Sequence, residues 1–92
     1  MKTTDSAVLA IRVHPLDNVA VVAADVPAGG AVRLDDGASL RAVEAIARGN
    51  KVALGPIPRG EAVIRYGEEI GTATDDIIAG QHVHTHNVRR GE

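Results

Sequence analysis

The sequence predicts a small, mainly β-stranded single domain. The chain has 92 residues, which is the size of one domain. Ten glycines and four prolines divide it into short segments, and the segments between them are rich in valine and isoleucine. This alternation is typical of short strands joined by tight turns. The predicted strands are Ala7–Val13, Asn18–Ala24, Val52–Leu54, Glu61–Tyr66 and His82–Asn87.

The apolar residues of this chain are unusually small. Hydrophobic residues make up 45% of the sequence, but phenylalanine and tryptophan are absent and Tyr66 is the one aromatic residue. Small side chains form a thin core, so we expect a partner or a second copy of the chain to cover part of the domain. The absence of cysteine excludes a disulfide framework, a thiolate nucleophile and a cysteine metal site.

Charge and hydropathy narrow the class of protein further. The net charge is −2 and no basic cluster is present, which argues against a nucleic-acid or membrane-surface role. The apolar runs are far too short to span a bilayer. Residues Met1 to Ser6 are polar and lack the apolar core of a signal peptide, so a cytoplasmic protein is expected.

A turn pattern recurs along the chain. The pattern apolar-x-x-Gly-x-x-Val occurs four times, with starts 20, 11 and 20 residues apart, which predicts a duplicated pair of turns. In each copy we expect glycine to adopt a positive φ and valine to begin the next strand. Proline takes the second position in two copies, where we assign it to the first corner of the turn. The copies begin at Val26, Ile46, Ile57 and Ile77.

One segment gives conflicting signals. In the segment 39–47, Leu40, Val43 and Ala47 fall at helical spacing, so propensity alone favours one short helix there. The second copy of the turn pattern begins inside this segment and favours an extended chain at its end. Both alternatives remain open at this stage.

A hairpin is predicted over Val63–Thr74. Residues that favour strands flank Gly67-Glu68-Glu69, which we assign to the reversal. Gly71 lies inside the returning strand and indicates a bulge or a close backbone contact. The last four residues, 89–92, are predicted to form a loose polar tail after a core that spans 7–88.

Three histidines within five residues are the clearest candidate for chemistry. His82, His84 and His86 alternate with Val83 and Thr85, so on a strand the three imidazoles would share one face. Neutral imidazole is a common ligand for transition metals. The alternative is a solvated strand face, and the pattern does not choose between metal ligation and substrate binding.

Two further polar motifs are candidates. His14-Pro15-Leu16-Asp17-Asn18 separates two apolar runs and is either a simple reverse turn or a pair of site residues, His14 and Asp17, at a strand end. Asn50-Lys51 lies in the second turn copy, where Lys51 is either a surface charge or an anion-binding group. The sequence contains no complete active site of its own.

Several of these motifs together resemble a known family. The strings HPLDNVAVV, GEAVIRYGEEIGTAT and IIAGQHVHTHN occur in this order and resemble the small N-terminal domain of altronate and galactarate dehydratases. Sulfolactate sulfo-lyases carry a similar small subunit. The resemblance covers roughly Ala7–Asn87. It implies an SAF domain, a module shared with sialic acid synthases and antifreeze proteins. It also implies a β-clip fold, a small twisted antiparallel sheet with long bent hairpins.

The resemblance also implies a function. We expect the small subunit of a sugar-acid dehydratase, a hydro-lyase that gives a 2-keto-3-deoxy acid. It would be inactive alone and would complete the site of a large subunit in the presence of Fe²⁺ or Mn²⁺. The alternatives are a stand-alone SAF module that binds a carbohydrate or protein, and a sulfo-lyase subunit. The expected substrate-binding residues are His14, Asp17, Asn50 and Lys51, and the expected metal ligands are His84 and His86.

The sequence departs from the family at one of these positions. Asn50 occupies a place where the family commonly has histidine. An amide can hydrogen-bond a hydroxyl group but cannot exchange a proton near neutral pH. The second turn is therefore not expected to supply an acid or a base.

Overall fold

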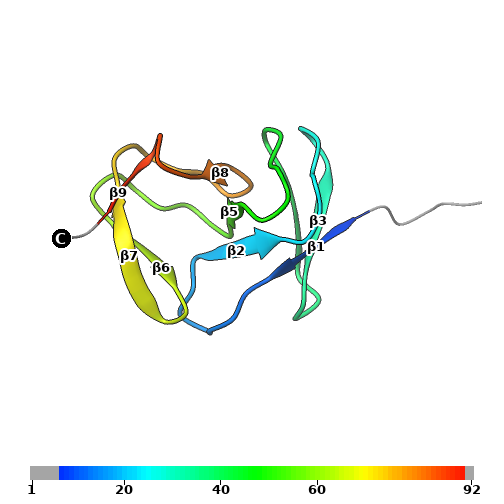
Figure 1. Ribbon diagram of the computed structural model, residues 1–92, viewed down its shortest axis with the longest axis horizontal. Coiled ribbons are helices and arrows are strands. Elements are labelled where there is room, and N and C mark those ends of the chain that lie inside the picture. The colour runs from blue at the N-terminus through cyan, green and yellow to red at the C-terminus, as the bar shows by residue number, and fades with distance from the viewer. Residues whose placement is uncertain (1–6, 91–92) are drawn as a thin grey trace, which may run out of the picture.

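Nine short strands form two sheets in the computed structural model, which describes residues 7–90 (Figure 1). The larger sheet has the order β4-β3-β1-β2-β5-β8 and the smaller one the order β6-β7-β9. All pairs are antiparallel except β1 with β3. The strands are β1 (Val8–Ile11), β2 (Val19–Val22), β3 (Ala31–Leu34), β4 (Ser39–Arg41), β5 (Lys51–Ala53), β6 (Ala62–Arg65), β7 (Glu68–Ala73), β8 (His82–Val83) and β9 (Val88–Arg90).

The β prediction is therefore confirmed. The part of the chain between residues 7 and 90 forms strands and turns without a helix. Accordingly, no helix in this part is long and apolar enough to cross a membrane. The curled, mostly antiparallel sheets agree with the expected SAF-like fold.

The four copies of the sequence pattern are four glycine turns. Gly29, Gly49, Gly60 and Gly80 have φ values of 80°, 86°, 90° and 87°. In each turn the residue after the glycine donates its N–H to a carbonyl three residues earlier. The glycine is thus the third residue of the turn, which needs a positive φ as in a type II turn. The prolines precede the first corner instead of occupying it, so that part of the prediction was wrong.

The turns associate in two pairs, as the spacing predicted. Val26 bridges to Ile46 in the first pair and Ile57 bridges to Ile77 in the second. A carboxylate ties each pair together, since Asp25 accepts the N–H of Arg48 at 2.8 Å. In the second pair Asp76 accepts the N–H of Arg59 at 2.9 Å.

Each pair of turns has its own apolar cluster. Val26 and Ile46 lie in the first cluster and Ile57 and Ile77 in the second, all no more than 2% exposed. The side chains around them are mostly alanine and valine, which confirms that the core is built from small residues. Strand β2 joins the clusters, because Val22 packs in the first and Val19 in the second.

The segment 39–47 contains no helix. Its first residues form β4, where Leu40 pairs with Val32 of β3. Further along, Ala42 donates its N–H to Gly30 and Ile46 donates to Val26, both at 2.9 Å. Pairing with the first turn thus satisfies the backbone and overrides the helical propensity.

The β6–β7 hairpin turns one residue earlier than predicted. Its two-residue turn is Tyr66-Gly67, with φ values of 58° and 75°, and Arg65 pairs with Glu68 across it. Two consecutive positive φ values define a type I′ turn. The prediction for Gly71 is confirmed. The register shifts between Val63 and Ile64 opposite it, and a Cβ at Gly71 would overlap Val88 and the backbone of Arg89.

The strand predicted for the three clustered histidines is shorter than expected. Strand β8 ends at Val83, and the chain then turns at residues 84–87. Buried Asn87 closes this turn by accepting the N–H of His84 at 2.9 Å and donating its own backbone N–H to the His84 carbonyl at 3.1 Å. The chain continues into β9, so Arg89 and Arg90 belong to a strand and not to a loose tail. Residues 91 and 92 lie outside the described part.

The β1–β2 connection fastens the hairpin to the larger sheet (Figure 1). Asp17, only 5% exposed, accepts the N–H groups of His14 at 3.1 Å and Gly67 at 2.8 Å. Burial alone would raise the pKa of Asp17, but these and two neighbouring backbone N–H groups outweigh it and lower the pKa. The side-chain amide of Asn18 accepts the N–H of Ile64 at 2.8 Å and donates to the carbonyl of Ala62 at 2.9 Å. These two bonds extend the contact with the hairpin along β6.

The turn glycines differ in the space around them, which gives a first prediction. At Gly49 a Cβ would meet no atom within 4 Å, whereas at Gly80 it would collide with the Arg41 carbonyl. Gly49→Ala should therefore cost only the left-handed backbone conformation, about 1–2 kcal/mol. Gly80→Ala should add a steric penalty and reach about 3–5 kcal/mol in total. Urea unfolding of both variants measures the difference, and equal losses would contradict the close approach.

The Asp17 contacts give a second prediction. Asp17→Asn replaces an acceptor oxygen with a donor and should lower the free energy of unfolding by about 2 kcal/mol at pH 7. The native pKa lies below the unfolded one, so this stabilisation is present above about pH 4 and is lost as the pH falls through the native pKa. The gap between native and variant proteins should therefore narrow in acid. A gap that stays constant from pH 7 to pH 2 in thermal unfolding would refute this assignment.

Candidate functional site

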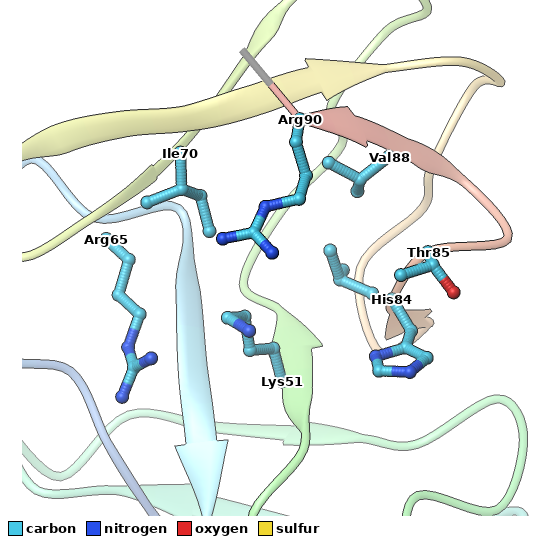
Figure 2. A pocket seen from close by; sticks show the side chains of 8 residues that line it. Lys51, Arg65, Ile70, His84, Thr85, Val88 and Arg90 are labelled. Atoms are coloured by element: carbon cyan, nitrogen blue, oxygen red, sulfur yellow. The ribbon is translucent and has the colours of Figure 1, made fainter. Parts of the chain in front are cut away.

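A half-open cleft of about 270 Å³ lies between the two sheets. Figure 2 shows its side chains converging from β5, β6, β7 and β9 and from the turn after β8. Ile70, Val83 and Val88 give it an apolar floor. The polar part of the lining is Lys51, Arg65, His84, Thr85 and Arg90.

The polar lining is dominated by cations. Lys51 and Arg90 extend toward one another across the cleft, and Arg65 stands at the rim opposite His84 (Figure 2). Among residues 7–90 none of these three cations has a carboxylate within ion-pair distance, since the one ion pair is Arg12–Asp36. Partial burial, together with the charges of Arg65 and Arg90, lowers the pKa of Lys51. Within residues 7–90 the cleft is therefore a positive site without a paired carboxylate.

Backbone pairing positions Lys51 and Arg90. Lys51 opens β5, directly between Val21 of β2 and Val83 of β8. Arg90 pairs with Gly71 of β7. Because Gly71 has no side chain, β9 can approach β7 closely enough to hold this arginine over the cleft.

Arg65 is held differently from the other two cations. Its guanidinium lies 4.4 Å from the centre of the Tyr66 ring and donates a 2.8 Å hydrogen bond to the Tyr66 hydroxyl. Tyr66 can lie there because of its left-handed backbone in the hairpin turn. Asp17 supports the same turn through Gly67. The β1–β2 connection therefore acts on the cleft indirectly, by fixing the turn that carries Arg65.

The predicted site residues separate into two groups. Lys51 and His84 line the cleft, while His14 and Asp17 lie behind the hairpin turn. The His14 ring packs against Gly67, and its Nδ1 accepts the Leu16 N–H at 3.1 Å. These contacts account for His14 and Asp17 as supports of the turn, and their roles in substrate binding stay predictions.

Asn50 does not line the cleft. It is the fourth residue of the second glycine turn, and its backbone carbonyl accepts the N–H of Val22 at 3.0 Å. Its role in substrate binding also stays a prediction.

Sequence reasoning missed Arg65, Thr85 and Arg90. Arg65 was hidden inside a predicted strand and Arg90 inside a predicted tail, and neither has a motif that signals its position.

The three clustered histidines do gather, although not along a strand as predicted. The His82 ring stacks on His84 and is tilted against His86, with 5.4 Å between the centroids in both pairs. Burial and the neighbouring His86, His84 and Lys51 lower the pKa of His82 despite the opposing charge of Glu44. Its Nε2 is buried and has no hydrogen-bond partner in the described part of the chain.

These imidazoles do not complete a site for Fe²⁺ or Mn²⁺. Within residues 7–90 no group of three or more histidine, aspartate or glutamate side chains is arranged to hold a metal ion. Both metals favour several oxygen or nitrogen ligands. Ligation by His84 and His86 thus stays a prediction and needs further ligands from another polypeptide segment.

The chemistry of the cleft suits an organic anion. Three cations can bind a carboxylate through charge-assisted hydrogen bonds, and Thr85 and His84 can bond hydroxyl groups. The apolar floor can contact a carbon skeleton.

Comparison with known proteins finds similar sequences of two kinds, dehydratases and a sulfo-lyase subunit. The chain is 48% identical over 79 residues to altronate dehydratase of Escherichia coli K12, covering 86% of this chain and 16% of that enzyme. It is 42% identical over 73 residues to galactarate dehydratase (L-threo-forming) of the same strain, covering 79% and 14%. It is also 49% identical over 41 residues to the (2R)-sulfolactate sulfo-lyase alpha subunit of Paracoccus pantotrophus, covering 45% and 61%.

The chain thus spans about one-sixth of the length of the dehydratases that it matches. The family model of the altronate/galactarate dehydratase SAF domain matches residues 8–91, nearly the whole sequence. The chain therefore belongs to the altronate/galactarate dehydratase SAF domain family.

Proposed function

We propose that this chain is the SAF domain part of a sugar-acid dehydratase and that its cleft binds the carboxylate of the acid substrate. The observation that carries this proposal is the convergence of Lys51, Arg65 and Arg90 without a carboxylate partner in residues 7–90. Like charges held together destabilise a fold unless an anion joins them. A sugar acid supplies both that anion and the hydroxyl groups that Thr85 and His84 can bond.

The remaining chemistry belongs to a large dehydratase subunit or domain. Dehydration to a 2-keto-3-deoxy acid removes the proton α to the carboxylate and expels the β-hydroxyl. Binding of the carboxylate by cations disperses the negative charge that develops next to it. The cleft offers this electrostatic contribution, but its lining contains no carboxylate base. The base and the complete Fe²⁺ or Mn²⁺ site are assigned to the large partner.

A sulfo-lyase is the second candidate function. The match to the sulfo-lyase alpha subunit covers more than half of that short protein. Sulfolactate carries a sulfonate beside its carboxylate, and a cleft with three cations could bind both groups. Comparing altronate, galactarate and sulfolactate as ligands of the same cleft distinguishes the two functions.

Substitution in the cleft gives the third prediction. Lys51→Met or Arg90→Met should each weaken binding of the preferred acid about 10-fold to 100-fold, because a hydrogen bond to a charged group is worth about 1.5–3 kcal/mol. Calorimetric titration of the 92-residue chain with the three acids measures this loss.

The neighbouring arginine provides a matched control. Arg89 is adjacent on β9 but does not line the cleft. Arg89→Met changes the net charge by the same amount as Arg90→Met and should leave affinity within about threefold. Equal weakening by the two substitutions would show that only the overall charge matters and would refute the assigned site.

The pKa of Lys51 gives the fourth prediction. A bound carboxylate favours the charged amine and should raise the pKa of Lys51 from its lowered value. Binding should correspondingly weaken as the pH rises through the pKa of the free Lys51. NMR titration of the lysine side chain with and without the acid measures both pKa values. An unchanged pKa at saturating acid would place the ligand elsewhere.

A further inference from the structure

One face of β1 is apolar and exposed. Leu9, Ile11 and Val13 are 45%, 39% and 56% exposed, whereas Ala10 between them is fully buried. Alternation along the strand places Leu9 and Ile11 on the outer face of the sheet and Ala10 on the core face, and Val13 follows two residues after the strand ends. Single exposed apolar side chains are common on a protein surface, but a contiguous row of them indicates an interaction surface.

Strand pairing continues this face to the cleft. Ile11 lies opposite Val21 of β2, and Val21 lies opposite Lys51 of β5. Residues directly opposite one another on paired strands point to the same face of the sheet. The apolar row Leu9, Ile11, Val13 and Val21, here called the β1 patch, therefore ends at a cation of the cleft.

We propose that the β1 patch is the docking surface for the large dehydratase body, which it brings against the open side of the cleft. This inference rests on the proposed function. Relatives such as the Escherichia coli altronate dehydratase carry about five times more chain than the matched segment. The patch and the cleft lie on one continuous face, so a single partner can cover both and close the cleft over its substrate.

Charge favours this occupant over a second copy of the chain. Packing two β1 patches together around a twofold axis would bring two clefts toward each other, each with Lys51, Arg65 and Arg90. Like charges that face one another across an interface oppose association. The partner that fits has an apolar centre against Ile11 and leaves the space opposite Lys51 to the bound acid substrate.

The test uses the altronate dehydratase of Escherichia coli. Residues 7–90 of this chain replace its 79 matching residues, and a protease site follows the inserted segment. After cleavage, gel filtration and a dissociation-constant measurement report whether the two pieces stay together. The unsubstituted segment should stay bound, and its release on cleavage would overturn the proposal.

Substitutions within the patch locate the contact. Ile11→Asp and Val13→Asp should each weaken association about 30-fold or more, as expected of residues central to an interface. Ile78 is a matched control, since it is 54% exposed but lies in the fourth glycine turn. Ile78→Asp should change the dissociation constant by less than threefold. Equal effects of Ile11→Asp and Ile78→Asp would overturn the proposal.

Two controls separate folding and catalysis from docking. Thermal unfolding of the 92-residue variants identifies any loss of fold. Because Val13 lies outside the β1 ladder, Val13→Asp keeps the test valid if Ile11→Asp unfolds. Lys51→Met in the chimaera should weaken substrate binding about 10-fold to 100-fold, and so slow dehydration at low substrate concentration, but leave association of the two pieces intact. Full activity of that variant, with association retained, would refute the carboxylate site and leave the docking surface standing.

Discussion

The fold depends on four glycines that hold a positive φ. Each one reverses the chain within a single turn, and the four turns then bridge in two pairs through Val26–Ile46 and Ile57–Ile77. These bridges place the largest buried side chains at the centre of two small clusters. A core of alanine and valine offers little apolar area, so the backbone pairing of the turns supplies much of the specificity that larger side chains provide elsewhere.

The cleft follows from the same turns. Lys51 begins the strand that leaves the second glycine turn, and β8, which ends just before His84, leaves the fourth. Asp17 and Asn87 support the other parts of the cleft. Asp17 fixes the hairpin turn beside Arg65, and Asn87 fixes the turn that leads into β9. Both turns use the same local arrangement. The side-chain oxygen of the fourth residue, Asp17 or Asn87, accepts the backbone N–H of the histidine at the first position, His14 or His84.

Local sequence patterns predicted the local geometry well. The turn glycines, the duplicated spacing and the tight contact at Gly71 follow from requirements that only glycine meets easily, and such requirements are visible in a single sequence. Of the two alternatives for 39–47 the helix was wrong and the extended chain was right, because this backbone pairs with a turn that precedes it in the chain. Arg65 and Arg90 were missed for a related reason: they meet Lys51 only after β6, β7 and β9 have paired, and no short motif encodes such long-range pairing.

Uncompensated charge is the part of the structure that stability alone does not explain. This chain has 12 acidic residues against 10 lysines and arginines, so carboxylates were available to pair with the cleft cations. Asp17 instead serves a turn, and Asp25 and Asp76 join the glycine turns. The cations are left to repel one another, and partial burial together with that repulsion lowers the pKa of Lys51. The use of these carboxylates in turns, together with three cations that face one cleft, supports the proposal that the cleft binds an anion from outside the domain.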